Sequence, residues 1–341
     1  GLLIRDRSAF ERARNVNAIV FDKTGTLTEG RFGVTDVIPL GGRSEEELLQ
    51  VAASIESQSE HPIAQGIVRT AQERRLTLTT PKSFSAIPGK GAQATIDGQA
   101  VKVVSPGYLR ENELVAADDR IRQVAEEGKT VIYVLIDEEV AGAIALADII
   151  RPESREALHR LKSMGIQVMM LTGDAEAVAR WVSKELDLDD YFAEVLPEQK
   201  AQKIKEVQSR GLVTAMTGDG VNDAPALTQA DVGIAIGAGT DVAIESADIV
   251  LVRSDPRDVT AIVSLARATY RKMIQNLWWA AGYNIFAIPL AAGVLYGLGI
   301  LLSPAVGAVL MAGSTVVVAI NARFLHVERE SEMRDGSTKP S

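Results

Sequence analysis

Residues 18–24 read Ala18-Ile19-Val20-Phe21-Asp22-Lys23-Thr24, and they continue into a turn rich in glycine and threonine. A short run that is apolar at every position is typical of a strand buried on both faces of a parallel sheet. Open α/β sheets place their ligand sites at the carboxyl ends of such strands. We therefore expect Asp22 to stand at the ligand-binding edge of a parallel sheet.

Four more apolar runs of strand length follow later in the chain. They are residues 167–171, 213–216, 232–236 and 249–252. The first two precede Thr172-Gly173-Asp174 and Thr217-Gly218-Asp219. Helical patterns at 154–164 and 199–209 separate the runs. Strands that alternate with helices indicate an α/β fold with a doubly wound parallel sheet.

The pattern differs between residues 30 and 141. Helical periodicity covers 45–57 and 62–75, and a β-hairpin is predicted around Asp97-Gly98, a dipeptide that favours tight hairpin turns. Residues 131–136 and 140–146 form a second candidate strand pair. We expect a separate α+β domain at 30–141, inserted into a parallel-sheet domain made of 1–29 and 142–270.

Composition divides the rest of the chain from these domains. The 341 residues carry a formal net charge of −9 and no cysteine, which excludes disulfides and thiol chemistry. No run of Lys or Arg suggests nucleic acid as a partner. Residues 276–322 contain no Asp, Glu, Lys or Arg.

The uncharged stretch predicts two transmembrane helices, at 276–298 and 303–323, within a membrane region 271–325. At about 1.5 Å per residue, each is long enough to cross a hydrocarbon core of about 30 Å. Arg271 and Arg323 lie at the outer ends, which places both ends on the cytoplasmic side. The alternative is a helical hairpin buried in a soluble core. Residues 326–341 read as a disordered tail.

Several polar residues follow the predicted parallel strands, and their chemistry suits phosphoryl transfer. Asp22 is a carboxylate nucleophile, and Asp219 and Asp223 can supply a Mg²⁺ site. Thr172 can donate a hydrogen bond to a transferred phosphoryl group, and Lys200 can neutralise its charge. Phosphoryl transfer depends mainly on positioning and charge neutralisation, and these residue types provide both. Turn capping by Gly and Asp would explain any one of these motifs but not all of them.

The motifs resemble those of P-type ATPases, whose phosphorylation domain belongs to the haloacid dehalogenase superfamily. The matching segments are Asp22-Lys23-Thr24-Gly25-Thr26-Leu27-Thr28, Thr172-Gly173-Asp174, Leu196-Pro197-Glu198-Gln199-Lys200 and Thr217-Gly218-Asp219-Gly220-Val221-Asn222-Asp223-Ala224-Pro225. The resemblance implies ATP as substrate and Asp22 as the residue that becomes phosphorylated. It makes Lys23, Thr24, Thr172, Gly173, Asp174 and Lys200 catalytic positions. It places Mg²⁺ on Asp22, the Thr24 carbonyl and Asp219, with Asp223 orienting Lys200.

Thr24 separates a pump from a phosphatase. Phosphatases of this superfamily usually carry an acid two positions after the nucleophile, which protonates the leaving group and activates water. Threonine does neither, so the acyl phosphate on Asp22 is expected to persist. A membrane-anchored phosphatase of the same superfamily remains the alternative function.

Within the inserted domain, Glu56 and His61 flank a short polar loop, and Gly89 and Gly91 flank Lys90. A His-Pro step can open a helix, and paired glycines allow backbone to approach a planar base. A histidine near a helix start is otherwise an ordinary surface residue. These four residues resemble the nucleotide-binding domain of heavy-metal-transporting (type IB) P-type ATPases, which assigns them to adenine and nearby nucleotide contacts.

The two predicted spans narrow the class of transported ion. Tyr283, Asn284, Met311 and Ser314 place oxygen, amide and thioether groups in them, a set that suits copper better than Mg²⁺ or Ca²⁺. The alternative is that such residues only pack between helices. The spacing resembles copper-type ATPases, in particular the CopB-like subgroup. The zinc/cadmium type usually carries a Lys and an Asp in these spans, and neither is present here.

The resemblance implies ATP-driven copper export across a cell membrane by a multi-pass protein with cytoplasmic soluble domains. A start without Met and an apolar first segment predict that this chain is the C-terminal part of a longer polypeptide. Its expected partners are membrane lipid and the actuator domain and other transmembrane helices of that polypeptide. A zinc/cadmium pump is the alternative within the family.

Overall fold

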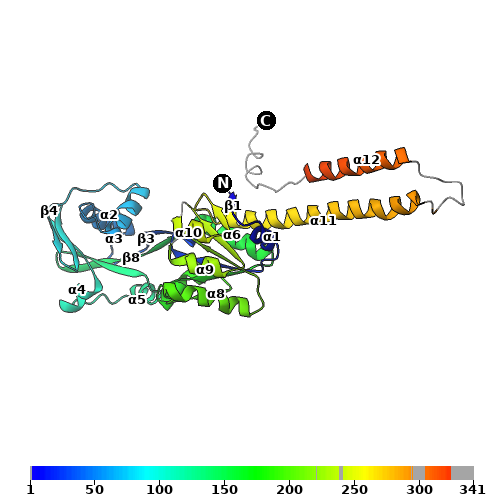
Figure 1. Ribbon diagram of the computed structural model, residues 1–341. Helices are drawn as coiled ribbons and strands as arrows, with labels where there is room; N and C mark the ends of the chain where they lie inside the picture. Colours follow the sequence, from blue (N-terminus) through cyan, green and yellow to red (C-terminus); the bar gives the residue numbers. More distant parts are fainter. Residues whose placement is uncertain (1, 220, 238–240, 293, 295–303, 324–341) are drawn as a thin grey trace, which may run out of the picture.

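A computed structural model (Figure 1) describes the chain except for residues 1, 220, 238–240, 293, 295–303 and 324–341. Two domains lie next to each other, and a long helix extends away from one of them. Each domain is built on its own sheet. The predicted tail, 326–341, lies outside the described residues.

The first domain contains a seven-stranded sheet in the order β1-β13-β12-β11-β2-β9-β10. All neighbouring strands run parallel except β1, which pairs antiparallel with β13 at one edge. The predicted doubly wound parallel sheet is confirmed. The strands are β1 (Leu2–Ile4), β2 (Ala18–Asp22), β9 (Gln167–Leu171), β10 (Asp190–Phe192), β11 (Thr214–Gly218), β12 (Val232–Ile236) and β13 (Ile249–Leu251).

Helices cover both faces of this parallel sheet because alternate strand residues are apolar on both sides. On β2, Ile19 and Phe21 pack in one hydrophobic cluster, whereas Ala18 and Val20 pack in another. The first cluster takes in α1 (Arg7–Ala13), α6 (Pro152–Ser163), α7 (Glu176–Glu185) and the start of α11 (Arg257–Ala291). The second takes in α8 (Lys200–Ser209), α9 (Ala224–Gln229) and α10 (Asp241–Ser246). We call this unit the parallel-sheet domain.

The second domain, called the inserted domain, has a six-stranded antiparallel sheet in the order β3-β8-β7-β6-β5-β4. Its strands are β3 (Thr28–Pro39), β4 (Lys82–Ile87), β5 (Gly91–Ile96), β6 (Gln99–Val104), β7 (Thr130–Ile136) and β8 (Glu139–Ile150). The helices α2 (Glu45–Glu56) and α3 (Pro62–Glu73) lie on one side, and α4 (Pro106–Glu111) and α5 (Asp119–Glu126) lie on the other. The hairpin predicted at Asp97-Gly98 joins β5 to β6.

Two long strands connect the domains. β3 leaves the parallel-sheet domain just after Asp22, β8 returns to it, and Thr28 pairs with Ile150 where they meet it. The inserted sheet therefore extends beyond the limits of 30 and 141 expected from sequence, to residues 28 and 150. Both extra segments are extended backbone that continues the ladder, so the domain border falls at Arg151.

The C-terminal region contains α11 and α12 (Pro304–Arg323), which run side by side (Figure 1). Asn321 joins them by accepting a hydrogen bond from Lys272 (3.0 Å) and donating one to Asn276 (2.8 Å). Within the described residues, no helix combines the length and the apolar composition that crossing a membrane requires. The two spans predicted at 276–298 and 303–323 are not confirmed, and residues 293 and 295–303 of them lie outside the described part.

Candidate active site

Asp22 is the last residue of β2, at the carboxyl edge of the parallel sheet. Its neighbours β9 and β11 are in register with it, so that Leu171 pairs with Asp22 and Thr217 with Phe21. The residues after β9 and β11 must therefore emerge beside Asp22. They begin with Thr172 and Asp219, as the sequence pattern predicts.

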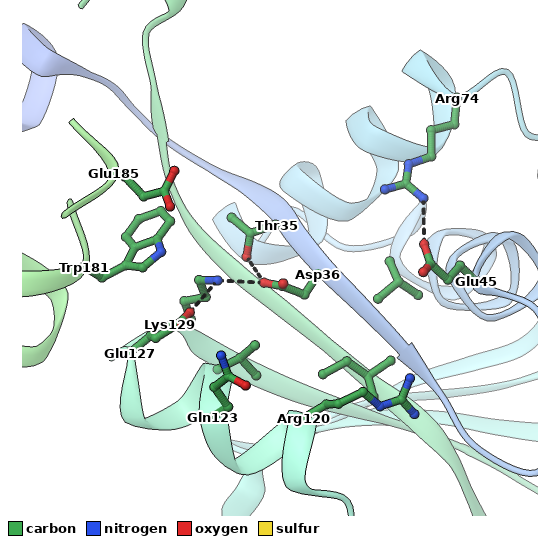
Figure 2. A pocket seen from close by; sticks show the side chains of 13 residues that line it. Thr35, Asp36, Glu45, Arg74, Arg120, Gln123, Glu127, Lys129, Trp181 and Glu185 are labelled. Atoms are coloured by element: carbon green, nitrogen blue, oxygen red, sulfur yellow. Dashed lines mark hydrogen bonds and ion pairs between the residues drawn. The ribbon is translucent and has the colours of Figure 1, made fainter. Parts of the chain in front are cut away.

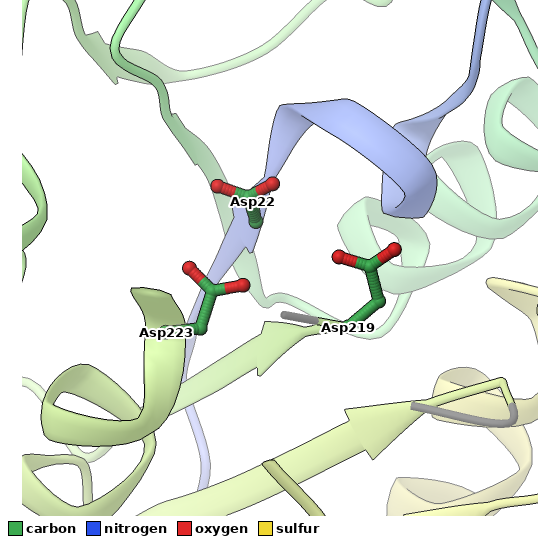
Figure 3. A group of neighbouring side chains, drawn as sticks. All are labelled: Asp22, Asp219 and Asp223. Carbon is green, nitrogen blue, oxygen red and sulfur yellow. The ribbon is translucent and has the colours of Figure 1, made fainter. Parts of the chain in front are cut away.

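Three carboxylates point into one space at this edge (Figure 3). One oxygen from each of Asp22, Asp219 and Asp223 lies within 4.8 Å of the others. Lys200, from the first turn of α8, donates from Nζ to Asp22 Oδ1 (2.6 Å) and Asp223 Oδ1 (2.7 Å). Asp22, Asp223 and Lys200 are buried, and Asp219 is half-buried.

Electrostatics at this site leave negative charge in excess. Burial and the nearby Asp223 carboxylate raise the pKa of Asp22 to about 7, although Lys200 opposes the shift. Burial, followed by Asp223, also raises the pKa of Asp219. Burial disfavours the charged form of Lys200, but Asp22 and Asp223 outweigh it and the pKa of Lys200 rises. One ammonium therefore faces three carboxylates, which favours binding of a further cation.

The oxygen-only donor set fits Mg²⁺, which prefers one or two carboxylates and retains several waters. Asp22 and Asp219 are placed to supply these ligands, and Lys200 bonds only one oxygen of Asp22, which leaves Oδ2 for the ion. Thr24 lies in the turn η1 (Lys23–Leu27) with an exposed side chain, so only its backbone is a plausible ligand on this side.

Gly25 allows the turn η1 to pass over Asp219. Its φ is +77°, a left-handed conformation that glycine adopts without strain. A Cβ on Gly25 would lie 1.9 Å from Asp219 Oδ2. The Asp-Lys-Thr-Gly sequence thus brings backbone against the second carboxylate of the cluster, which a side chain would prevent.

Lys23 faces a different set of acids from Asp22. Its Nζ lies 3.0 Å from both Asp148 Oδ2 and Asp174 Oδ2, and its side chain is almost fully buried. Burial opposes the charge on Lys23, but Asp148 and Asp174 outweigh it and raise the pKa of Lys23. Thr172 donates from Oγ1 to Asp174 Oδ2 (3.0 Å) and accepts from the Asp174 backbone N–H (3.1 Å). Gly173 lies between these two residues in the same turn.

Asp148 and Arg151 are functional candidates that sequence reasoning missed. Asp148 Oδ2 also accepts from the Thr28 hydroxyl (2.5 Å), and Asp148 Oδ1 accepts from the Arg31 backbone N–H (3.0 Å). Arg151 donates to the Thr28 and Gly25 carbonyls at 3.0 and 3.1 Å. These bonds join both linking strands to the turn that follows Asp22. The available signal was an acid and an arginine just before Pro152, where the chain was expected to return.

A cavity of about 470 Å³ on the α2–α3 side of the inserted sheet contains the predicted nucleotide residues. Glu56 at the end of α2, His61 before α3, and Gly89 and Gly91 in the β4–β5 turn all line it. The remaining lining is mostly apolar, from β4 to β7. An apolar cavity with a few convergent polar groups is the usual form of a small-molecule site.

Each polar group of this cavity is positioned by a different local structure. His61 caps α3 by accepting the Ile63 N–H at Nδ1 (3.3 Å), which leaves Nε2 for a ligand. Gly89 has φ +69° with open space around it, whereas a Cβ on Gly91 would lie 2.0 Å from the Val103 carbonyl oxygen. Burial raises the pKa of Glu56 to about 7, and no cation among the described residues pairs with it. A buried carboxylate in such surroundings is unfavourable in a folded protein and suggests a binding role.

The structure describes only some of the side chains that were predicted to contact a transported ion. Asn284 and Met311 are exposed, Ser314 is half-buried, and the side chain of Tyr283 lies outside the described part of the structure. Large exposed apolar side chains surround them on α11 and α12. They include Leu277, Trp278, Trp279, Ile285, Phe286, Ile288, Val309, Val316 and Ile320.

Residues 16–231 match the family model of haloacid dehalogenase-like hydrolases. The chain belongs to this family. The match spans β2, β9 and β11, and thus every residue of the carboxylate cluster.

Curated relatives similar to this chain include proteins named as copper transporters. The chain is 66% identical over 325 residues to copper-exporting P-type ATPase B of Archaeoglobus fulgidus, covering 95% of this chain and 47% of that protein. It is 43% identical over 326 residues to copper-exporting P-type ATPase B of Enterococcus hirae, covering 95% and 44%. The chain thus spans about half the length of these relatives.

Solved structures give a similar result. A zinc-transporting PIB-type ATPase matches with a TM-score of 0.80 and 36% identity, covering 96% of this chain and 52% of that one. The catalytic domain of the CPx-ATPase CopB-B matches with a TM-score of 0.52 and 32% identity, covering 77% of this chain and 96% of that one.

The excess negative charge at the carboxylate cluster predicts that Mg²⁺ stabilises the protein. Saturating Mg²⁺ at about 100 times its dissociation constant should add about 2.7 kcal/mol to the free energy of unfolding. Asp219→Asn removes one ligand and should lower Mg²⁺ affinity at least about tenfold, which is measured as a smaller rise in Tm. Asp187→Asn, at an exposed acid outside the cluster, is the control. Equal Mg²⁺ shifts in Asp219→Asn and wild type would contradict the site.

Glu56 predicts a pH-dependent loss of stability. Its folded pKa, about 7, exceeds its ordinary value of 4.5, so the folded state holds this proton more tightly than the unfolded state. Stability is therefore fully present below pH 4.5 and is lost as the pH rises through 7. Glu56→Gln should raise the free energy of unfolding by about 1–3 kcal/mol at pH 8 and by much less at pH 5. Thermal unfolding at both pH values measures it.

The control for this prediction is Glu73→Gln, which changes an exposed glutamate on α3. It should leave the difference between pH 5 and pH 8 unchanged. If Glu56→Gln were less stable than wild type at both pH values, the buried carboxylate would be favourable and the assignment would be wrong.

Proposed function

We propose that this chain is the catalytic part of a P-type ATPase that exports copper ions through an aspartyl-phosphate intermediate. The observation that carries the proposal is Asp22, a buried nucleophile with Lys200 on one oxygen and further carboxylates placed for Mg²⁺. The parallel-sheet domain would be the phosphorylation domain, and the inserted domain the nucleotide-binding domain. The copper exporters that the chain resembles support the same function.

The reaction follows from the residues at the two sites. The cavity beside Glu56 and His61 would hold the adenine, and Nε2 of His61 would donate to the nucleotide. An oxygen of ionised Asp22 attacks the γ-phosphorus of ATP, a P–O bond forms, and the bond to ADP breaks with ADP leaving as an anion. Lys200 neutralises charge on the transferred phosphoryl oxygens, and Thr172 donates to them from its hydroxyl. Mg²⁺, when bound by Asp22, the Thr24 carbonyl and Asp219, would supply further charge neutralisation.

Thr24 supports a pump rather than a phosphatase. Its side chain stands exposed at the position where a general acid would be needed, and a hydroxyl cannot serve as one near neutral pH. The acyl phosphate on Asp22 would therefore last until another domain supplies the group that activates water. In the proposed pump, that group would come from an actuator domain in another part of the polypeptide.

Copper is favoured over zinc as the transported ion. The curated relatives are named as copper transporters, whereas a matching solved structure is a zinc transporter at lower identity. Met311 offers a thioether beside Ser314, and Tyr283 and Asn284 offer oxygen and amide groups on the facing helix. Of these groups the thioether is the soft ligand, and soft ligands favour Cu(I).

Membrane attachment is part of the proposal. The distal half of α11 and the described part of α12 present large apolar side chains, with Trp278 and Phe286 each 70% or more exposed. An exposed apolar surface of this extent is unfavourable in water. We place it against lipid and the other transmembrane helices of a multi-pass cell-membrane protein, with both sheet domains in the cytoplasm.

Phosphorylation of Asp22 tests the proposed chemistry. With γ-labelled ATP and Mg²⁺, the protein should acquire an acid-stable, hydroxylamine-labile label, and Asp22→Asn should acquire none. Asp187→Asn, at an exposed acid whose carboxylate pairs with Lys162, should be labelled like wild type. No label in the complete protein would contradict the mechanism, and label that turns over rapidly in this chain alone would favour a phosphatase.

Metal identity requires the complete protein. ATP hydrolysis should rise with Cu(I) or Ag(I), because the thioether and hydroxyl groups on α11 and α12 include no acidic side chain that would favour a harder ion. Activities with Cu(I), Cu(II), Ag(I) and Zn(II) are compared at equal free metal concentrations. Activation by Zn(II) alone would contradict copper export and leave the phosphorylation chemistry intact.

A further inference from the structure

A cation–ring contact joins the two domains outside the linking strands. Lys129, just before β7 of the inserted domain, has Nζ 5.0 Å from the ring centroid of Trp181 on α7 of the parallel-sheet domain. The same ammonium lies 2.9 Å from Asp36 Oδ2 and 2.8 Å from Glu127 Oε2. Figure 2 shows Lys129 between these two acids and facing Trp181. Its side chain is 7% exposed, so the cation is enclosed by groups of both domains.

Gly128 brings the backbone of the inserted domain against α7. Its φ of +76° suits glycine, and a Cβ there would lie 2.8 Å from both the backbone N and Cγ2 of Val178. The turn between α5 and β7 therefore approaches α7 as closely as backbone allows. Together with Lys129 and Trp181, it forms a small contact that we call the α7 contact.

The α7 contact has polar surroundings, as expected of a contact that separates. It borders a polar cavity of about 440 Å³ whose charged lining includes Arg74, Arg120 and Glu185 (Figure 2). Contacts between domains that move are more polar than domain cores. Lys129 keeps Asp36 and Glu127 when Trp181 departs, because both acids belong to the inserted domain. Separation therefore exposes the ammonium to water without breaking an ion pair.

The α7 contact and the nucleotide cavity lie on different sides of the inserted sheet. The cavity is lined by Val103 and Ile132, which belong to the same hydrophobic cluster as α2 and α3. Lys129 follows α5, which packs on the opposite side. If the α2–α3 side turns toward the parallel-sheet domain to bring a nucleotide to Asp22, the α5 side, with Lys129, turns away from α7.

We propose that Lys129 and Trp181 are positioning residues that hold the inserted domain away from Asp22 until a nucleotide binds. The proposal rests on the proposed function, because it concerns the movement that brings ATP to Asp22. Nucleotide binding then has to break the α7 contact. We call the arrangement in which the inserted domain has turned toward Asp22 closed, and the contact sets the fraction of molecules in it. A buried cation–ring contact of this kind changes such an equilibrium by about three- to tenfold.

Removing the Trp181 ring should change the reaction of Asp22 with ATP but not its reaction with a small phosphate ester. Trp181→Leu should increase the rate of Asp22 phosphorylation by subsaturating ATP about three- to tenfold, because more molecules reach the closed arrangement. In the complete protein, where another domain hydrolyses the acyl phosphate, turnover of p-nitrophenyl phosphate should stay unchanged, since this small ester reaches Asp22 without the inserted domain. Trp181→Phe retains an aromatic face and should restore the wild-type rate with ATP.

The chain offers a matched control. Lys102 lies 5.5 Å from the ring centroid of Tyr108, and both residues belong to the inserted domain. Tyr108→Leu removes this cation–ring contact, together with the hydrogen bond from Lys102 to the Tyr108 hydroxyl (3.0 Å), within a single domain. It should leave the rate with ATP unchanged.

Distance measurement tests the contact without relying on ATP chemistry. The chain has no cysteine, so spin labels at Gln72→Cys on α3 and Lys205→Cys on α8 report the spacing of the domains alone. In the nucleotide-free protein, Trp181→Leu should broaden the distance distribution, and Tyr108→Leu should not. An unchanged distribution in Trp181→Leu would overturn the proposal, even if the protein did not hydrolyse ATP.

The remaining outcomes are also decisive. A rate with ATP that falls or stays the same in Trp181→Leu, with ester turnover retained, would show that the contact does not hold the domains apart.

If Trp181→Leu did not fold, a second measurement would take the place of this variant. It is the quenching of Trp181 fluorescence by acrylamide, in protein with Trp278 and Trp279 changed to Phe. A non-hydrolysable ATP analogue should increase the quenching, and no increase would overturn the proposal. Failure of the proposed function would appear separately, as absence of label on Asp22 with an intact distance response.

Discussion

Three carboxylates held close together around one ammonium are the feature on which the rest of the structure depends. Like charges at this spacing repel, and burial strengthens the repulsion because little water screens it. The sheet imposes the arrangement, since β2 and β11 are hydrogen-bonded neighbours that end at the same edge. Lys200 neutralises part of the charge through two short bonds. What remains is a site that gains stability from any added positive charge and is therefore suited to Mg²⁺ and to the charge changes of phosphoryl transfer.

The residue next to the nucleophile controls the connection to the inserted domain. Lys23 turns away from Asp22 and pairs with Asp148, near the end of the returning strand β8. Asp148 in turn bonds Thr28, where the outgoing strand β3 begins. The turn that carries Asp22 and the base of the inserted domain are thus one bonded unit. A movement of the inserted domain must bend β3 and β8 beyond this unit, and so Asp22 can keep its geometry while the nucleotide approaches.

The sequence was informative wherever a local pattern has a single physical meaning. The apolar run before Asp22 could only be a buried strand, and three such runs followed by polar turns predicted which side chains would meet. The contacts of Asp148 could not be found in this way. Its partner Lys23 lies 125 positions away, and an acid near a proline is common in any turn. The contact of Lys129 with Trp181 could not be predicted from sequence either, because nothing local distinguishes either residue from an ordinary surface side chain.

Domain limits and the ion pathway were less predictable for different reasons. β3 and β8 both run from one domain to the other, so the border at Thr28 and Ile150 lies within strands rather than in a loop. Met311 and Asn284 are exposed in the structure, and two helices alone could not enclose the coordination site that is proposed for them. Such a site needs ligands from several facing helices, and a pattern read within one helix cannot supply them.

Glu56 shows how binding and stability oppose each other in the inserted domain. A carboxylate buried with a pKa near 7 lowers the stability of the fold at neutral pH, and an amide of the same shape would not. Packing therefore gives no reason for glutamate at this position. Nucleotide binding does give a reason. The edge of a nucleotide base presents both donors and acceptors, and a carboxyl group near its pKa can accept or donate as the ligand requires. We infer that recognition of the nucleotide, rather than folding, accounts for the charge at Glu56.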